Sequence, residues 1–225
     1  LCALLDDVAK VEVTLLGGKQ VRKIPLLAAL QTHDIVHFAG HSHYDPDNPS
    51  KSGWRLHEGV LTAGELSKLS RPPLLVFSNS CQAGTTSEWA GGYRYEGQAF
   101  GIGSAFLLAG VRNYVGTFWV VHDEESVLFA TSFYQFIVAG LSLGEALLKA
   151  RHVVLQQRGW QGLTWASYML YGDPAFVLLP GAPLPLQVED SSSDKSSVRT
   201  LGIDARRQEE ERTLVTEERT LWSLN

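Results

Sequence analysis

The sequence predicts an α/β fold with a mostly parallel β-sheet and helices on both of its faces. Three observations lead to this prediction. Segments typical of strands and of helices alternate along the chain, which is the order expected of a parallel sheet. Strands such as PLLVF (73–77) are almost continuously apolar, as strands covered on both faces are. The composition, 44% apolar and 19% charged over 225 residues, is ordinary for a globular protein that buries a substantial core.

The first half of the chain contains three predicted strands. A polar loop follows the second of them, and Thr62 with Glu65 three residues later has the pattern of a helix-initiating capping box. The expected order is a strand at 11–16, a helix at 21–31, a strand at 34–40, a helix from Thr62 and a strand at 72–80.

The second half is predicted to be richer in helix. The expected order is a Gly-rich apolar helix at 97–110, a strand at 113–121, helices at 124–139 and 142–158, and a closing segment at 167–179 with a turn at 172–174. After Pro180 the composition becomes rich in proline, serine and charge, which is typical of a linker and tail. We therefore expect one domain at 1–180, and a linker with a charged helical or disordered tail at 181–225.

Charge and cysteine content exclude several classes of function. The net charge of −5 gives no electrostatic case for nucleic-acid binding, and no apolar run is long enough to cross a bilayer. The two cysteines, Cys2 and Cys81, do not form a disulfide framework, so a reducing cytoplasm is the expected location. The start at Leu1, without a methionine, indicates a piece of a longer or processed protein. No cofactor is expected.

One cysteine stands where a nucleophile would be expected. In open parallel sheets, binding and catalytic residues lie at the carboxyl ends of the strands. Cys81 follows the predicted strand LLVFSNS directly. The strand at 34–40 ends at His41, which would then lie close to Cys81. A histidine beside a thiol favours the reactive thiolate, so the two residues suggest a cysteine nucleophile with a histidine base.

Three other interpretations apply to these residues: a buried apolar cysteine, a metal site and a nucleophile elbow. A lone cysteine at a strand end is commonly a small buried apolar residue. Four odd-numbered histidines would share one face of a strand and could bind a metal: His33, His37, His41 and His43. No clustered cysteines or carboxylates are available to complete a zinc site. A nucleophile elbow would need glycines at the positions of Asn79 and Ala83.

The chain resembles the CHAT domain, a caspase-like peptidase domain found beside tetratricopeptide repeats, in the same clan as caspases, separases and gingipains. The resemblance spans about residues 30–179, and we expect the domain to be N-terminally incomplete relative to the family. Four blocks carry it: HDIVHFAGHS (33–42), PPLLVFSNSCQAG (72–84), the long block from Asn113 to Arg151, and ASYMLYGDPAF (166–176).

The resemblance implies a cysteine endopeptidase with a Cys-His dyad. It assigns the nucleophile to Cys81 and the base to His41, whereas His37 matches a second strand histidine that is not the base. The oxyanion hole would be formed by the backbone N–H groups of Ser42 and Cys81. The family usually has glycine where this chain has Ser42, which raises a question about the backbone conformation there.

The resemblance also points to a basic P1 residue. By similarity to separases, Asp123 would lie at the base of the P1 pocket and bind arginine or lysine. The alternative is that Asp123 is one of three acids stabilising the start of a helix. The partners implied are a protein substrate and regulatory repeat domains. A catalytically silent scaffold or sensor domain is the alternative function.

Overall fold

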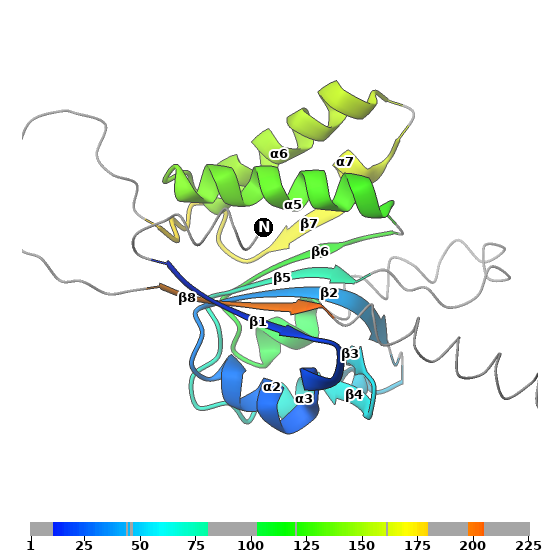
Figure 1. Cartoon of the computed structure of the whole chain (residues 1–225), viewed down its shortest axis with the longest axis vertical. Coiled ribbons are helices and arrows are strands. Elements are labelled where there is room, and N and C mark those ends of the chain that lie inside the picture. Colours follow the sequence, from blue (N-terminus) through cyan, green and yellow to red (C-terminus); the bar gives the residue numbers. More distant parts are fainter. Residues whose placement is uncertain are drawn as a thin grey trace, which may run out of the picture.

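A computed structural model describes residues 11–43, 45, 47–80, 103–119, 121–160, 162–179 and 198–204. These residues form one central sheet between two helical layers (Figure 1). The predicted α/β class, a mostly parallel caspase-like sheet with helices on both faces, is confirmed. No helix in the described part of the chain is both long enough and apolar enough to span a membrane.

Six strands form the main path of the sheet, in the order β1-β8-β2-β5-β6-β7. All neighbouring pairs along it are parallel except β6 with β7. The strands are β1 (Val11–Gly17), β2 (Ile35–His43), β5 (Leu75–Ser80), β6 (Asn113–Thr117), β7 (Tyr168–Tyr171) and β8 (Val198–Asp204). A short hairpin of β3 (Gly53–Leu56) and β4 (Gly59–Thr62) extends the end of β2.

Each face of the sheet has its own apolar core. On one face α5 (Asp123–Val138) and α6 (Leu143–Arg158) pack on the odd-numbered residues of β2 and β5, such as Ile35 and Phe77. On the other face α2 (Lys23–Leu30), α3 (Ala63–Leu66) and a helix at 103–108 pack on even-numbered residues such as Val36. The remaining short elements are α7 (Thr164–Ser167), η1 (Gly18–Gln20) and η2 (Pro49–Lys51).

The capping box predicted at Thr62 is confirmed at the start of α3. The Thr62 hydroxyl accepts from the backbone N–H of Glu65, and the Glu65 carboxylate accepts from the Thr62 backbone. Lys23 of α2 also pairs with this carboxylate at 2.9 Å. Partial burial alone would raise the pKa of Glu65, but these hydrogen bonds and the Lys23 charge outweigh it and hold the pKa below its usual value.

Most predicted elements are present, with small shifts at their ends. The strand expected at 113–121 stops at Thr117, and the polar loop expected after β2 contains the β3–β4 hairpin. For the helix expected at 97–110, residues before 103 lie outside the described part of the chain, and 103–108 are helical.

The largest difference concerns the expected tail. Residues 198–204, placed by the sequence analysis in the linker and tail, form strand β8 between β1 and β2. The physical reason is burial: Leu201 and Ile203 are almost fully buried in the core beside α2. At the start of β8, the Asp34 carboxylate accepts from the backbone N–H of Arg199.

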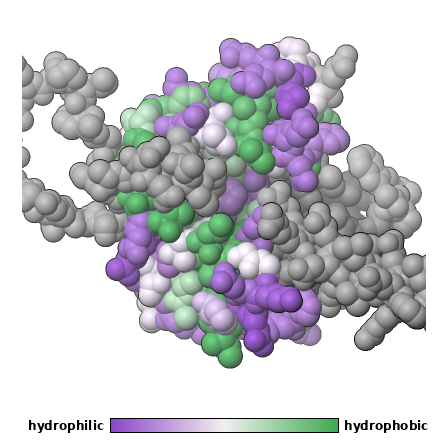
Figure 2. All heavy atoms as spheres, viewed as in Figure 1, coloured by the Kyte–Doolittle hydropathy of each residue, from purple (hydrophilic) through white to green (hydrophobic). Residues whose placement is uncertain are grey.

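The surface is mixed in polarity. Figure 2 shows apolar and polar side chains side by side on the face in view. Exposed apolar residues include Leu15 on β1 and Val127 on α5, at 59% and 55% exposure. These two side chains lie at the rim of the cavity described below.

Candidate active site

The register between β2 and β5 defines the candidate site. These strands are parallel neighbours, with Ala39 opposite Asn79 and Gly40 opposite Ser80. The next residue on β2 is His41, and the next residue after Ser80 is Cys81, which lies outside the described part of the chain. The prediction that these two strands are neighbours is confirmed.

His41 and Ser42 lie at the end of β2, where this strand also pairs with β3. His41 is half-buried opposite Arg55, and Ser42 is buried opposite Trp54. Ser42 lies inside a continuous β-strand, an extended conformation that any residue adopts. Serine in place of the family's usual glycine is therefore compatible with the backbone at this position.

A chain of hydrogen bonds ties the ends of β2, β3 and β5 together beneath this edge. The Ser42 hydroxyl donates to the Ser80 hydroxyl, which lies 2.8 Å from the hydroxyl of Ser78. The indole N–H of Trp54 donates to Ser78 at 3.2 Å. Thr117 of β6 also donates to the Ser80 carbonyl at 3.4 Å. Because polar groups buried together this way orient one another, the network holds Ser42 and Ser80 in fixed register.

His37 lies on the same face of β2 as His41 but deeper in the sheet. Its ring is only 8% exposed and stacks on Phe77 with a centroid distance of 5.0 Å. It also contacts the ring of Tyr134. This packed environment is compatible with the expectation that His37 is not the base.

Asp123 is the first residue of α5 and is exposed. Its carbonyl accepts from the hydroxyl of Ser126, and the neighbouring Glu124 pairs with Arg158 at 3.1 Å. Three acids in the first turn suit the positive end of the helix dipole. Both interpretations of Asp123, a P1 carboxylate and a helix-stabilising acid, are compatible with this position.

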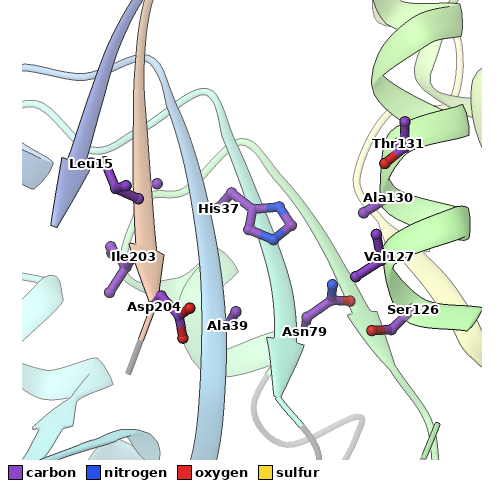
Figure 3. A pocket seen from close by; sticks show the side chains of 11 residues that line it. Leu15, His37, Ala39, Asn79, Ser126, Val127, Ala130, Thr131, Ile203 and Asp204 are labelled. Carbon is purple, nitrogen blue, oxygen red and sulfur yellow. The ribbon is translucent and has the colours of Figure 1, made fainter. Parts of the chain in front are cut away.

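A cavity of about 220 Å³ lies between the sheet and α5 (Figure 3). His37, Ala39 and Asn79 face it from the sheet, and Ser126, Val127, Ala130 and Thr131 face it from α5. The remaining lining residues come from β1 and β8: Leu15, Gly202, Ile203 and Asp204. The cavity thus adjoins the edge where β2 and β5 end.

Asn79 is oriented by a long-range contact that the sequence analysis missed. The hydroxyl of Tyr168, fully buried on β7, donates to the Asn79 side-chain oxygen at 2.7 Å. No local pattern signals this bond, because its partners are 89 residues apart. The strand that carries Asp204 has only a weak signal in the sequence. Apolar Leu201 and Ile203 alternate with smaller or polar residues, as in a strand.

The histidines form no metal centre in this part of the chain. Among the described residues, no three His, Cys, Asp or Glu side chains gather closely enough to hold a metal ion. Asp34, at the opposite end of β2 from His41, pairs with Arg71.

Comparison with protein families decides the identity of the fold. The model of the CHAT domain matches residues 3–173, well over half of the chain. The chain belongs to the CHAT-domain family. This CHAT domain is therefore related to caspase-like peptidases, as the sequence motifs indicated.

A curated relative agrees with this assignment. Tetratricopeptide repeat protein 28 from Homo sapiens is 30% identical to this CHAT domain over 128 residues. The match covers 56% of this chain but only 5% of that protein, so the chain spans a small part of its relative's length. The relative is named for its tetratricopeptide repeats, the repeats that the resemblance places beside CHAT domains.

Proposed function

We propose that this CHAT domain is a cysteine endopeptidase in which Cys81 is the nucleophile and His41 the general acid and base. The observation that carries the proposal is the pairing of Gly40 with Ser80 on adjacent parallel strands. His41 follows Gly40 in the chain, and Cys81 follows Ser80. Neighbouring strands are about 4.8 Å apart, so two side chains at adjacent strand ends can reach one substrate atom.

The mechanism follows from these groups. The Cys81 thiolate attacks the carbonyl carbon of the scissile peptide bond, and the oxyanion accepts hydrogen bonds from the backbone N–H groups of Ser42 and Cys81. His41 donates a proton to the leaving amine, which departs and leaves a thioester. His41 then takes a proton from water, whose oxygen attacks the thioester and releases the acid and the thiolate.

The Ser42 network supports the oxyanion role in this proposal. Ser42 is 5% exposed and its side chain is held by Ser80, so its backbone has little freedom to shift. A preorganised donor stabilises the transition state without a reorganisation cost. The side chain of Ser42 needs no chemical role.

The proposal includes a basic P1 residue and regulation by other domains. Asp123 would accept a charge-assisted hydrogen bond from arginine or lysine at the mouth of the site. Repeat modules elsewhere in the full protein would control access, by analogy with the repeat-containing relative. A thiol nucleophile fits a reducing location, and the cytoplasm is proposed on that ground.

Hydrolysis of a peptide set tests this function. Fluorogenic peptides with Arg, Lys, Asp, Asn or Leu at P1 are incubated with the chain and with its Cys81→Ala and Asp123→Asn variants. We expect cleavage after Arg and Lys, abolished in Cys81→Ala. For Asp123→Asn, we expect a loss of about tenfold or more in kcat/KM for basic peptides only, which corresponds to roughly 1.4 kcal/mol.

The outcomes separate the parts of the proposal. Cleavage after other residues keeps the peptidase and removes the role of Asp123. Equal cleavage by Cys81→Ala would contradict the nucleophile. Absence of cleavage by both the chain and the protein with its repeat domains would favour the scaffold function.

A further inference from the structure

We propose that β8 is an exchangeable strand. The space between β1 and β2 is a groove for one extended segment, and a second copy of this chain fills it with its own β8 when the protein is concentrated. This assembly does not depend on the proposed peptidase function. Three features of the fold lead to it: the order of the strands, the contacts that hold β8, and the connection of β8 to the rest of the chain.

The connection from β1 to β2 skips one strand position of the sheet. The two strands follow each other in the sequence with α2 between them, but β8 lies between them in space and is parallel to both (Figure 1). Neighbouring strands are about 4.8 Å apart, so β1 and β2 stand roughly 9.6 Å from each other. This position is therefore filled by a segment that neither flanking strand adjoins in the sequence.

The part of the chain that matches the family does not include β8. The CHAT-domain model matches residues 3–173, which contain β1, β2 and the elements up to β7, whereas β8 begins at Val198. β8 is thus an addition to the sheet of the family domain. The groove contacts only the strand itself, so a strand from another chain can make the same contacts.

The groove holds β8 along its whole length. All seven residues of β8 pair with β1, and those from Thr200 to Asp204 pair with β2 as well. Leu201 and Ile203 are 0% and 1% exposed in the core beside α2. The groove therefore fits an extended segment with apolar side chains at alternate positions, and an empty groove would expose this part of the core.

Polar contacts at the start of β8 fix its register. The Asp34 carboxylate accepts a hydrogen bond from the backbone N–H of Arg199 at 3.1 Å, and the Arg199 carbonyl accepts one from the Asp34 N–H at 2.7 Å. The Arg199 guanidinium pairs with Glu12 of β1 at 3.4 Å. A strand shifted by one residue would lose these contacts and turn its apolar side chains to the opposite face. The groove thus favours the sequence of β8 over a general apolar strand.

The connection to β7 allows β8 to reach its own groove or that of a neighbour. Residues 180–197, which lie outside the described part of the chain, link Leu179 to Val198. A segment of this length spans up to roughly 60 Å when extended. Within one chain, β7 and β8 are separated by four strand spacings, about 19 Å. The connection is therefore long enough to carry β8 into an adjacent copy.

Concentration decides between the two forms. Exchange of an identical element keeps every contact that β8 makes, so the closed monomer and the exchanged dimer differ mainly in the cost of association. A tether of this length holds a strand near its own groove at an effective concentration on the order of 1 mM. Monomers should prevail at micromolar concentration, and exchanged dimers should form as the concentration approaches the millimolar range.

Disulfide capture between two copies tests the exchange. Val13 on β1 and Thr200 on β8 are direct partners, at a strand spacing that a disulfide can bridge. Thr200 is 2% exposed and its hydroxyl has no partner among the described residues, so Thr200→Cys removes no hydrogen bond seen there. One full-length chain carries Val13→Cys and the other Thr200→Cys, both with Cys2→Ala and Cys81→Ala. Because neither chain retains Cys81, the result is separate from any test of peptide hydrolysis.

The two chains are mixed at concentrations from about 10 μM to about 1 mM, equilibrated, and oxidised. Mass spectrometry then quantifies the linked heterodimer. We expect its fraction to rise with concentration and to exceed that of a collision control at least tenfold at the highest concentration. The control pairs Val13→Cys with Leu148→Cys, at a 53% exposed position of α6.

A single chain that carries both Val13→Cys and Thr200→Cys shows whether the geometry permits the bond. If the bond forms within this chain, but the linked heterodimer never exceeds the collision control, strand exchange is rejected. If the bond does not form even within the chain, β8 is not beside β1 and the proposal fails with it.

Competition by peptides identifies the occupant of the groove. A synthetic peptide of residues 196–206, in excess, should lower the yield of linked heterodimer severalfold. The same peptide with Leu201→Glu and Ile203→Glu should have no effect, and one with Arg199→Glu should compete severalfold less well. Equal competition by the Arg199→Glu peptide would show that the groove accepts apolar strands in general, and would overturn the selection of a second copy.

Discussion

Tyr168 and Tyr134 illustrate how position alone gives one residue type two different roles. Both side chains are fully buried in the core beneath α5. The hydroxyl of Tyr168 donates to Asn79, next to the candidate site, whereas that of Tyr134 has no protein partner among the described residues. Burial raises the pKa of Tyr134, so its hydroxyl stays neutral throughout the physiological range.

Removing the hydroxyl should therefore destabilise the fold at Tyr168 but not at Tyr134. Tyr168→Phe leaves the Asn79 oxygen without its donor and should lower the free energy of unfolding by about 1–3 kcal/mol. Tyr134→Phe removes a buried hydroxyl that has no hydrogen-bond partner among the described residues, so the free energy of unfolding should stay the same or rise slightly. Urea denaturation measures the free energy of unfolding of both variants. Equal destabilisation of the two variants would contradict the assigned role of the Tyr168 hydroxyl.

At the scale of elements, the sequence predicted the strands that carry the candidate site but not every strand of the sheet. β2 and β5 contain apolar runs that end in polar residues, so both strands could be predicted from the pattern, although β2 continues to His43, three residues beyond the predicted end. β8 is short and flanked by serine-rich and charged segments, whose composition is typical of a tail. Its place between β1 and β2 is set by pairing with residues far away in the chain, which local patterns do not record.

Burial of β8 gives a direct test at this scale. Ile203→Ala removes a side chain that is 1% exposed, and should lower the free energy of unfolding by roughly 2–5 kcal/mol. The matched control Leu163→Ala, at a 59% exposed position, should change it by no more than about 0.5 kcal/mol. Thermal or urea unfolding reports the difference. A similarly small effect for Ile203→Ala would show that β8 is not part of the folded core.

The whole molecule brings together residues from three distant segments at one edge of the sheet. β2 contributes His41 and Ser42, β5 leads to Cys81, and β8 contributes Asp204. The family motifs in the sequence identified the first two segments and the fold, and the family match agrees. The cavity could not be predicted, because its volume depends on how far α5 stands from Ala39 and Gly202.

The alkylation rate of the Cys81 thiol reports whether His41 is coupled to it. The chain is treated with iodoacetamide at pH 6.5, and mass spectrometry follows Cys81 with Cys2 as an internal reference. An unperturbed thiol, with a pKa of about 8.5, is roughly 1% ionised at this pH. A histidine-paired thiol is far more ionised, although its lower basicity makes each thiolate somewhat less reactive. We predict that Cys81 reacts severalfold faster than Cys2 and loses this advantage in His41→Ala. Equal rates for the two cysteines, unchanged by His41→Ala, would contradict it.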